Sequence, residues 1–238
     1  MKILVSDLDG TLIQNKKIDE TVIRKLYKWK SDKNMFVIAT GREYTSVLHL
    51  KGLTNFEYSI NCNGALIVDK NDEVIYASYI DLDEVKKVIN LINDDFDVFV
   101  SDGFQIMRVR TIEDLKLKNV LFFSITHKNK SHSKVRKFMK KLLDNKIQIG
   151  MTLNGSHLDL GPLDHTKATA IKILQKKLDV NDNDIYVVGD QENDMSMINA
   201  YENSYAIKSG NKDLQLLANN VVDNVGEIIS NETFNIYK

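Results

Sequence analysis

The chain is poor in the residues that cross-link a protein, rigidify it or give it a strong net charge. Its 238 residues include one cysteine and one proline, and the formal net charge at pH 7 is −1. A single cysteine excludes an intramolecular disulfide framework and a zinc site built from cysteines. Because proteins that bind the nucleic-acid backbone normally carry a basic excess, the balanced charge argues against a nucleic-acid partner.

Long apolar runs are also missing. None approaches the ~20 residues of a membrane-spanning helix, and Asp7 and Asp9 interrupt the first apolar stretch too early for a secretory leader. With 43% hydrophobic and 27% charged residues, the composition is typical of a globular protein. We therefore expect no membrane partner and a reducing compartment, most simply the cytoplasm. The sequence does not indicate the oligomeric state.

Both ends of the chain alternate short apolar runs with amphipathic segments. Strands are predicted at residues 2–6, 35–39, 58–61, 65–69, 74–78, 185–188 and 204–207. Helices are predicted at residues 19–31, 43–50, 166–178, 193–199 and 212–218, with a last short one near Gly226. Alternation of this kind implies an α/β fold: a Rossmann-like parallel sheet with helices on both faces.

The middle of the chain has a different order, which is typical of an α+β unit with its own core. Helices are predicted at residues 83–92 and 134–143, and strands at 98–100, 105–110, 120–126, 147–153 and 157–160. We therefore expect a core from residues 1–80 and 161–238 and an inserted α+β cap from residues 81–160. The only proline, Pro162, follows Gly161 where the insertion ends, which favours a hinge because proline fixes φ and glycine does not.

Two acidic residues, Asp7 and Asp9, directly follow the first predicted strand, on a turn that Gly10 permits. In an open parallel sheet, ligands bind at the carboxyl ends of the strands. Carboxylates so close together repel one another unless a cation or a proton lies between them. Mg²⁺ favours oxygen ligands, so this segment is a candidate magnesium site. The alternative is a surface turn rich in aspartate and glycine.

A second acidic cluster follows the predicted strand at 185–188. Asp190 is placed to join Asp7 around one metal ion, and Asn193 and Asp194 lie at the start of the next helix. Aspartate and asparagine also favour helix N-termini without any catalytic role. This cluster by itself leaves both interpretations open.

Further positions have the chemistry of an anion site. Thr40 and Gly41 follow the second predicted strand, where a hydroxyl and free backbone N–H groups bind anions, although an ordinary turn is the commoner role. Lys167 opens a predicted helix, where the helix macrodipole disfavours a cation, so it is either a residue that holds an anion or one of the chain's many solvated lysines. Arg42 is either a contact of the substrate or the cap, or the partner of a core carboxylate.

In their order along the chain, these pieces resemble the motifs of the haloacid dehalogenase superfamily of phosphotransferases. Residues 7–11 resemble the first motif, Thr40 the second, Lys167 the third and residues 189–194 the fourth. The insertion between the second and third motifs resembles the C2-type (IIB) cap of the Cof-like subfamily, and Asn63 also matches that subfamily's pattern. Residues 164–166 are bulkier than the residues that usually precede this lysine in the family, so we expect a different pocket shape.

The resemblance implies a Mg²⁺-dependent phosphatase of small phosphorylated metabolites, such as sugar phosphates. It implies that Asp7 attacks phosphorus and forms an aspartyl-phosphate, while Asp9 acts first as acid and then as base. The implied metal ligands are Asp7, Asp9 through its backbone carbonyl, Asp190 and Asp194. The implied phosphate-binding residues are Thr40, Gly41, Lys167 and Asn193, and the candidate substrate contacts are Arg42 and Asn63.

Two other functions stay open. A phosphomutase of the same fold needs a second phosphate site in the cap. A non-catalytic phospho-acceptor or sensor module keeps its phosphate, and Asp9 argues against that module because a stable acyl phosphate needs no second acid. The basic stretch at residues 127–146 is either a solvated helix face or a surface that attracts polyanionic substrates, and Arg108 and Arg110 are further candidate contacts.

Overall fold

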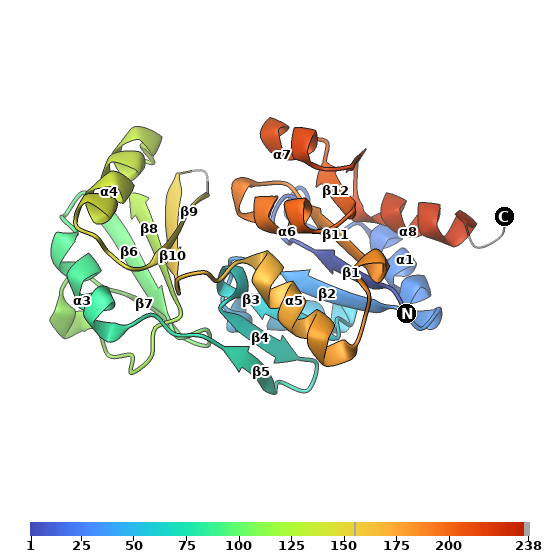
Figure 1. The fold of residues 1–238 in the computed structure, drawn as a ribbon, viewed down its shortest axis with the longest axis horizontal. Coiled ribbons are helices and arrows are strands. Elements are labelled where there is room, and N and C mark those ends of the chain that lie inside the picture. Colours follow the sequence, from blue (N-terminus) through green and yellow to red (C-terminus); the bar gives the residue numbers. More distant parts are fainter. Residues whose placement is uncertain (155, 236–238) are drawn as a thin grey trace.

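The computed structural model describes residues 1–154 and 156–235, which form two separate sheets with helices packed against them (Figure 1). The strands are β1 Ile3–Ser6, β2 Met35–Ala39, β3 Tyr58–Asn61, β4 Leu66–Asp69, β5 Val74–Ala77, β6 Phe96–Ser101, β7 Ile106–Arg108, β8 Phe122–His127, β9 Gly150–Asn154, β10 His157–Gly161, β11 Ile185–Gly189, β12 Asn203–Ile207 and β13 Asn220–Val222. The α-helices are α1 Glu20–Ser31, α2 Lys51–Thr54, α3 Leu82–Leu91, α4 His132–Asp144, α5 Lys167–Leu178, α6 Met195–Ala200, α7 Lys212–Leu217 and α8 Val225–Asn235.

Strands from both ends of the chain form the larger sheet, in the order β13-β12-β11-β1-β2-β3-β4-β5. Strands β13 to β3 run parallel, and the β4–β5 hairpin adds an antiparallel edge. Because helices cover both faces, the strands in the middle are apolar on both sides. Leu4 of β1 packs in a cluster with Leu26 of α1, whereas Val5 packs on the other face with Ile171 of α5.

The smaller sheet is antiparallel, in the order β7-β6-β8-β10-β9, and comes from the middle of the chain. Phe123 and Leu158 of its central strands pack in the cluster that includes residues of α3 and α4. Successive side chains of a strand point to opposite faces. Ser124 and Asp159, which are opposite one another on β8 and β10, therefore point away from these helices, toward the larger sheet.

The fold class predicted from the sequence is confirmed, because a mostly parallel sheet is combined with an inserted α+β unit. Residues 43–50 were expected to form one helix but make two 3-10 turns, Tyr44–Ser46 and Leu48–Leu50. The Ser46 hydroxyl donates to the Glu43 carbonyl at 3.0 Å, a local bond that competes with regular helix. Each helix in residues 1–154 and 156–235 is too short or too polar to cross a membrane.

Candidate active site

The acidic and anion-binding residues predicted from the sequence meet at one edge of the larger sheet. Strands β11, β1 and β2 are neighbours and run parallel. Asp190, Asp7 and Thr40 each directly follow the last residue of one of these strands. Since parallel strands present their carboxyl ends at the same edge, the three side chains converge there, with Asp7 in the middle.

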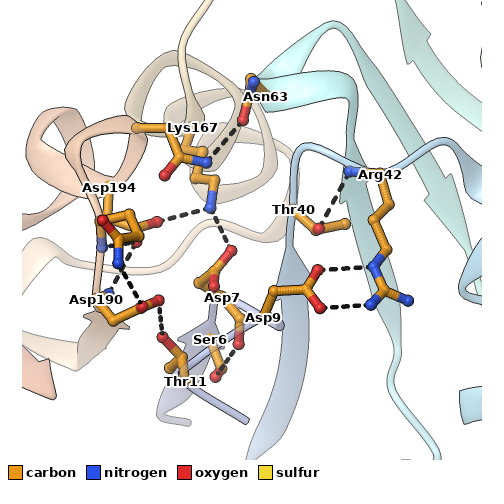
Figure 2. A network of polar contacts seen from close by, with 12 residues as sticks. Ser6, Asp7, Asp9, Thr11, Thr40, Arg42, Asn63, Lys167, Asp190 and Asp194 are labelled. Atoms are coloured by element: carbon orange, nitrogen blue, oxygen red, sulfur yellow. Dashed lines mark hydrogen bonds and ion pairs between the residues drawn. The ribbon is translucent and has the colours of Figure 1, made fainter. Parts of the chain in front are cut away.

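Lys167 binds two of the acids at once. It is the first residue of α5 and is fully buried, with 0% of its surface exposed. Its Nζ donates to Asp7 Oδ1 and to Asp194 Oδ1, each at 2.6 Å, as Figure 2 shows. Desolvation alone would lower the pKa of Lys167, but Asp194 and Asp7 raise it above its ordinary value, so the ammonium stays charged.

Asp190 completes a cluster of three buried carboxylates. Oxygens of Asp7, Asp190 and Asp194 lie within 4.8 Å of one another. Asp190 Oδ1 accepts a hydrogen bond from the Thr11 hydroxyl at 2.8 Å. Asp194 Oδ2 accepts from the backbone N–H groups of Asp190 and Gln191, at 2.9 and 3.0 Å. These bonds hold the acids in place although their charges repel.

The cluster carries more negative charge than its lysine neutralises, because three carboxylates face one ammonium. Burial raises the pKa of Asp7 to about 8; Lys167 opposes this shift, and Asp194 and Asp190 add to it. A divalent cation would remove this excess, and hard oxygen donors are the ligands that Mg²⁺ prefers. The residues therefore fit a magnesium ion, which the side chains of Asp7, Asp190 and Asp194 would hold.

Two glycines allow the backbone to come this close to the acids. Gly10 has a φ of +89°, and a Cβ at its position would lie 2.2 Å from Asp190 Oδ2. A Cβ at Gly189 would lie 2.4 Å from Asp194 Cγ. At Gly10, any other residue would be strained in its backbone and would displace Asp190.

Asp9 lies outside the carboxylate cluster and faces Arg42. Arg42 Nε donates to Asp9 Oδ2 at 2.7 Å, and a second contact joins Nη2 to Oδ1 (Figure 2). The Asp9 side chain is 58% exposed, so this pair stands at the mouth of the site. Arg42 thus pairs with a carboxylate of the core, and it also lies in the lining of the cavity next to Asp7, where a substrate contact stays open.

Thr40, Gly41 and Asn193 lie beside Asp7 in the wall of a cavity of about 300 Å³. The buried Thr40 Oγ1 accepts from the backbone N–H of Arg42 at 3.2 Å. A Cβ at Gly41 would lie 3.2 Å from Asn63 Oδ1, so the glycine packs directly on that amide. Asn63 is not among the residues that line this cavity, and it lines an adjacent pocket that shares Phe122 and Asp159.

Residues of the smaller sheet close the cavity from the opposite side, and the sequence did not identify them. The cap-side lining consists of Ile106, Phe122, Ser124, His157 and Asp159. Glu43 and Gln191 of the core also line the cavity without having been predicted. The signal for Asp159 was a polar residue between Leu158 and Leu160, whose buried side chains mark the other face of β10.

The basic stretch of the cap lies away from this cavity. A separate groove beside α4 is lined by Lys134, Lys137, Lys140 and Lys141, none of which belongs to the described lining of the cavity at Asp7. Arg108 of β7 pairs with Asp97 of β6. This placement favours a solvated helix face over a surface that guides polyanionic substrates.

Comparison with known proteins relates most of the chain to one family. A family model of haloacid dehalogenase-like hydrolases matches residues 4–107 and 97–227. An uncharacterized protein of Mycoplasma capricolum is 29% identical over 95% of this chain and 98% of its own. The 5-amino-6-(5-phospho-D-ribitylamino)uracil phosphatase of Bacillus subtilis is 23% identical over 83% of this chain and 80% of its own.

Solved structures have the same fold. A haloacid dehalogenase subclass IIB sugar phosphatase matches with a TM-score of 0.84 and 20% identity, over 99% of this chain and 100% of that one. A haloacid dehalogenase-like hydrolase of Bacillus subtilis matches with a TM-score of 0.86 and 17% identity, over 97% of this chain and 99% of that one. The chain therefore belongs to the haloacid dehalogenase-like hydrolases and is a Cof-like phosphatase.

Proposed function

We propose that this phosphatase is Mg²⁺-dependent and hydrolyses monoesters of small, uncharged polar metabolites such as sugars, through an aspartyl-phosphate on Asp7. The observation that carries the proposal is the buried Lys167, whose Nζ lies 2.6 Å from both Asp7 and Asp194 beside Asp190. A carboxylate attacking an anionic phosphate ester must overcome charge repulsion. Fixed positive charge around Asp7 is therefore what the reaction needs.

Each residue of the site has a task in this proposal. Asp7 forms the bond to phosphorus, and Lys167 neutralises charge on Asp7 and the phosphoryl oxygens. Asp9 protonates the leaving oxygen and later takes a proton from water, and Arg42 orients its carboxylate at the cavity mouth. Thr40, Gly41 and Asn193 bind the phosphoryl oxygens.

Asp7, Asp190 and Asp194 hold the metal by their side chains in this proposal, and Asp9 contributes its backbone carbonyl. The bound ion would offset negative charge on the phosphoryl group.

The lining of the cavity supports an uncharged leaving group. Its cap side presents Ser124, His157 and Asp159 for hydrogen bonds, beside apolar Ile106 and Phe122. In the described lining, a second phosphate would meet no Arg or Lys other than Arg42, which already pairs with Asp9, and it would face Asp159. This favours a phosphatase over a phosphomutase.

In the same proposal, residues 81–160 are a cap that selects the leaving group, and residues 1–80 and 161–238 are the catalytic core. Residue 155 of the cap and residues 236–238 of the core lie outside the described residues. The single cysteine supports a reducing compartment, the cytoplasm.

A phosphate-release screen over sugar phosphates, nucleotides and bisphosphates, with MgCl₂ or with EDTA, tests the proposal. We expect Mg²⁺-dependent release from singly phosphorylated sugars or similar compounds and none from Asp7→Asn. Release by Asp7→Asn at near the wild-type rate would overturn the mechanism. Activity that requires a bisphosphate activator would instead indicate a mutase, and stable labelling without turnover would indicate a phospho-acceptor module.

A further inference from the structure

A hydrogen-bonded line of three side chains leads from the smaller sheet to the proposed phosphate site. Asn63 Nδ2 donates to Asp159 Oδ2 at 3.2 Å, and Asn193 Nδ2 donates to Asn63 Oδ1 at 3.1 Å. Asp159 belongs to β10 and is 6% exposed, whereas Asn63 and Asn193 belong to core loops that follow β3 and β11. The line therefore joins two parts of the chain that pack around separate hydrophobic clusters.

The core holds the middle of this line in place. The Asn63 backbone N–H donates to the Thr40 carbonyl at 3.0 Å. Its φ of +53° lies in the left-handed region, which asparagine tolerates better than most residues. Gly41 packs against its amide, where a Cβ would lie 3.2 Å from Oδ1. With the backbone fixed, the main freedom left to Asn63 is which end of its amide faces which neighbour.

The carboxylate at one end decides that orientation. An ionised carboxylate only accepts hydrogen bonds, whereas an amide both donates and accepts. Asn63 must therefore present its NH₂ group to Asp159 and its oxygen to Asn193. Asn193 must in turn present its NH₂ group to Asn63, and its second N–H is left to donate to an oxygen of a bound phosphoryl group. The reversed line would put a carbonyl oxygen in that place, which repels an anion.

We propose that Asp159 is a positioning residue that fixes the amide of Asn193 through Asn63, so that the smaller sheet prepares the phosphate site of the core. The inference rests on the proposed phosphate-binding role of Asn193. It gives the cap a part in binding the transferred group, besides contacting the leaving group.

Asp159→Asn tests the inference, because it keeps the shape of the side chain but allows either amide orientation. The probe is inorganic phosphate with saturating MgCl₂, titrated by calorimetry, because phosphate carries no leaving group that Asp159 could contact. We expect phosphate to bind about two- to tenfold more weakly. The apparent dissociation constant rises because the fraction of molecules whose Asn193 presents an N–H to the phosphate falls to between about a half and a tenth. Asp94→Asn, the same change at an exposed cap position, should leave binding unchanged.

A double-mutant cycle adds a readout that a merely structural role would not change. Asn63→Ala removes the middle of the line, so Asp159→Asn should weaken phosphate binding no further in that background. Additive losses would overturn the inference, and so would a raised KM in Asp159→Asn with unchanged phosphate binding. Thermal unfolding of each variant checks that it is folded.

The same measurements separate this inference from the proposed function. Turnover by the wild type, with phosphate binding unchanged in Asp159→Asn, would overturn the positioning role alone. Weakened phosphate binding in Asp159→Asn, with no turnover by the wild type on any monoester, would overturn the proposed function alone.

Discussion

Replacing Lys167 with methionine would remove the cation that bridges Asp7 and Asp194 while nearly keeping the length of the side chain. Removing one partner of a buried ion pair costs about 3–5 kcal/mol, because the other charge is left without compensation. Lys167 has 0% exposure and both of its contacts are 2.6 Å long. We therefore expect the free energy of unfolding of the metal-free variant to fall by an amount within that range.

Magnesium should offset much of this loss. A ligand at a hundredfold excess over its dissociation constant stabilises the folded state by about 2.7 kcal/mol. Without Lys167 the carboxylates of Asp7, Asp190 and Asp194 face the ion with no competing ammonium. We therefore expect Mg²⁺ to bind Lys167→Met more tightly and to stabilise it more than the wild type.

The measurement is urea unfolding of both proteins at pH 7.5, in EDTA and in saturating MgCl₂. Lys172→Met is the matched control, because Lys172 is exposed on the same helix and should show neither effect. A loss below about 1 kcal/mol in EDTA would refute the assignment of Lys167 as a compensating buried charge. Equal stabilisation of both proteins by Mg²⁺ would refute the assignment of the carboxylates as its ligands.

Three further predictions use other parts of the structure. Burial raises the pKa of Asp7 from 3.8 to about 8, so in EDTA its contribution to stability is fully present below pH 3.8 and is lost as the pH rises through 8. Asp7→Asn should thus match the wild type near pH 3.5 and be more stable at pH 9, and a constant difference in urea midpoints would contradict this. The pKa of Glu84 lies below its ordinary 4.5, because its carboxylate accepts hydrogen bonds from the Lys87 side chain and from the backbone N–H of Gln148. Glu84→Gln should lower the free energy of unfolding by about 1 kcal/mol at pH 7, a loss that disappears as the pH falls through the depressed pKa, and pH-independent loss would argue against a charge effect. Gly10→Ala should lower the free energy of unfolding by about 1–3 kcal/mol and abolish most phosphate release. Gly52→Ala should be tolerated, because nothing lies within 4 Å of the new Cβ. Equal effects of the two substitutions would refute the close approach of Gly10 to Asp190.

Features that depend on neighbours in the sequence were predictable. Asp7, Thr40 and Asp190 each follow an apolar strand, and parallel strands end at one edge, so their meeting was expected from the order of elements. The unfavourable lysine at the start of α5 indicated an anion, and the anions are Asp7 and Asp194.

Features that depend on packing were not predictable. The helix expected at residues 43–50 gave way to 3-10 turns, and the three-residue strand β13 depends on pairing with β12 at the sheet edge. The sequence offered Asn63 as a candidate substrate contact but did not indicate that its amide bonds to both Asp159 and Asn193. No local pattern reports a partner that is 96 or 130 residues away in the chain.

The sequence by itself determined the alternation of strands and helices, the inserted unit and the polar residues at the strand ends, because periodicity and turn chemistry act over a few residues. Only the tertiary structure decided which carboxylates share Lys167, that Arg42 holds Asp9, and which face of the antiparallel sheet closes the cavity. Charge interactions and side-chain packing depend on distance in space, and the fold brings Lys167 to Asp7 across 160 residues of chain.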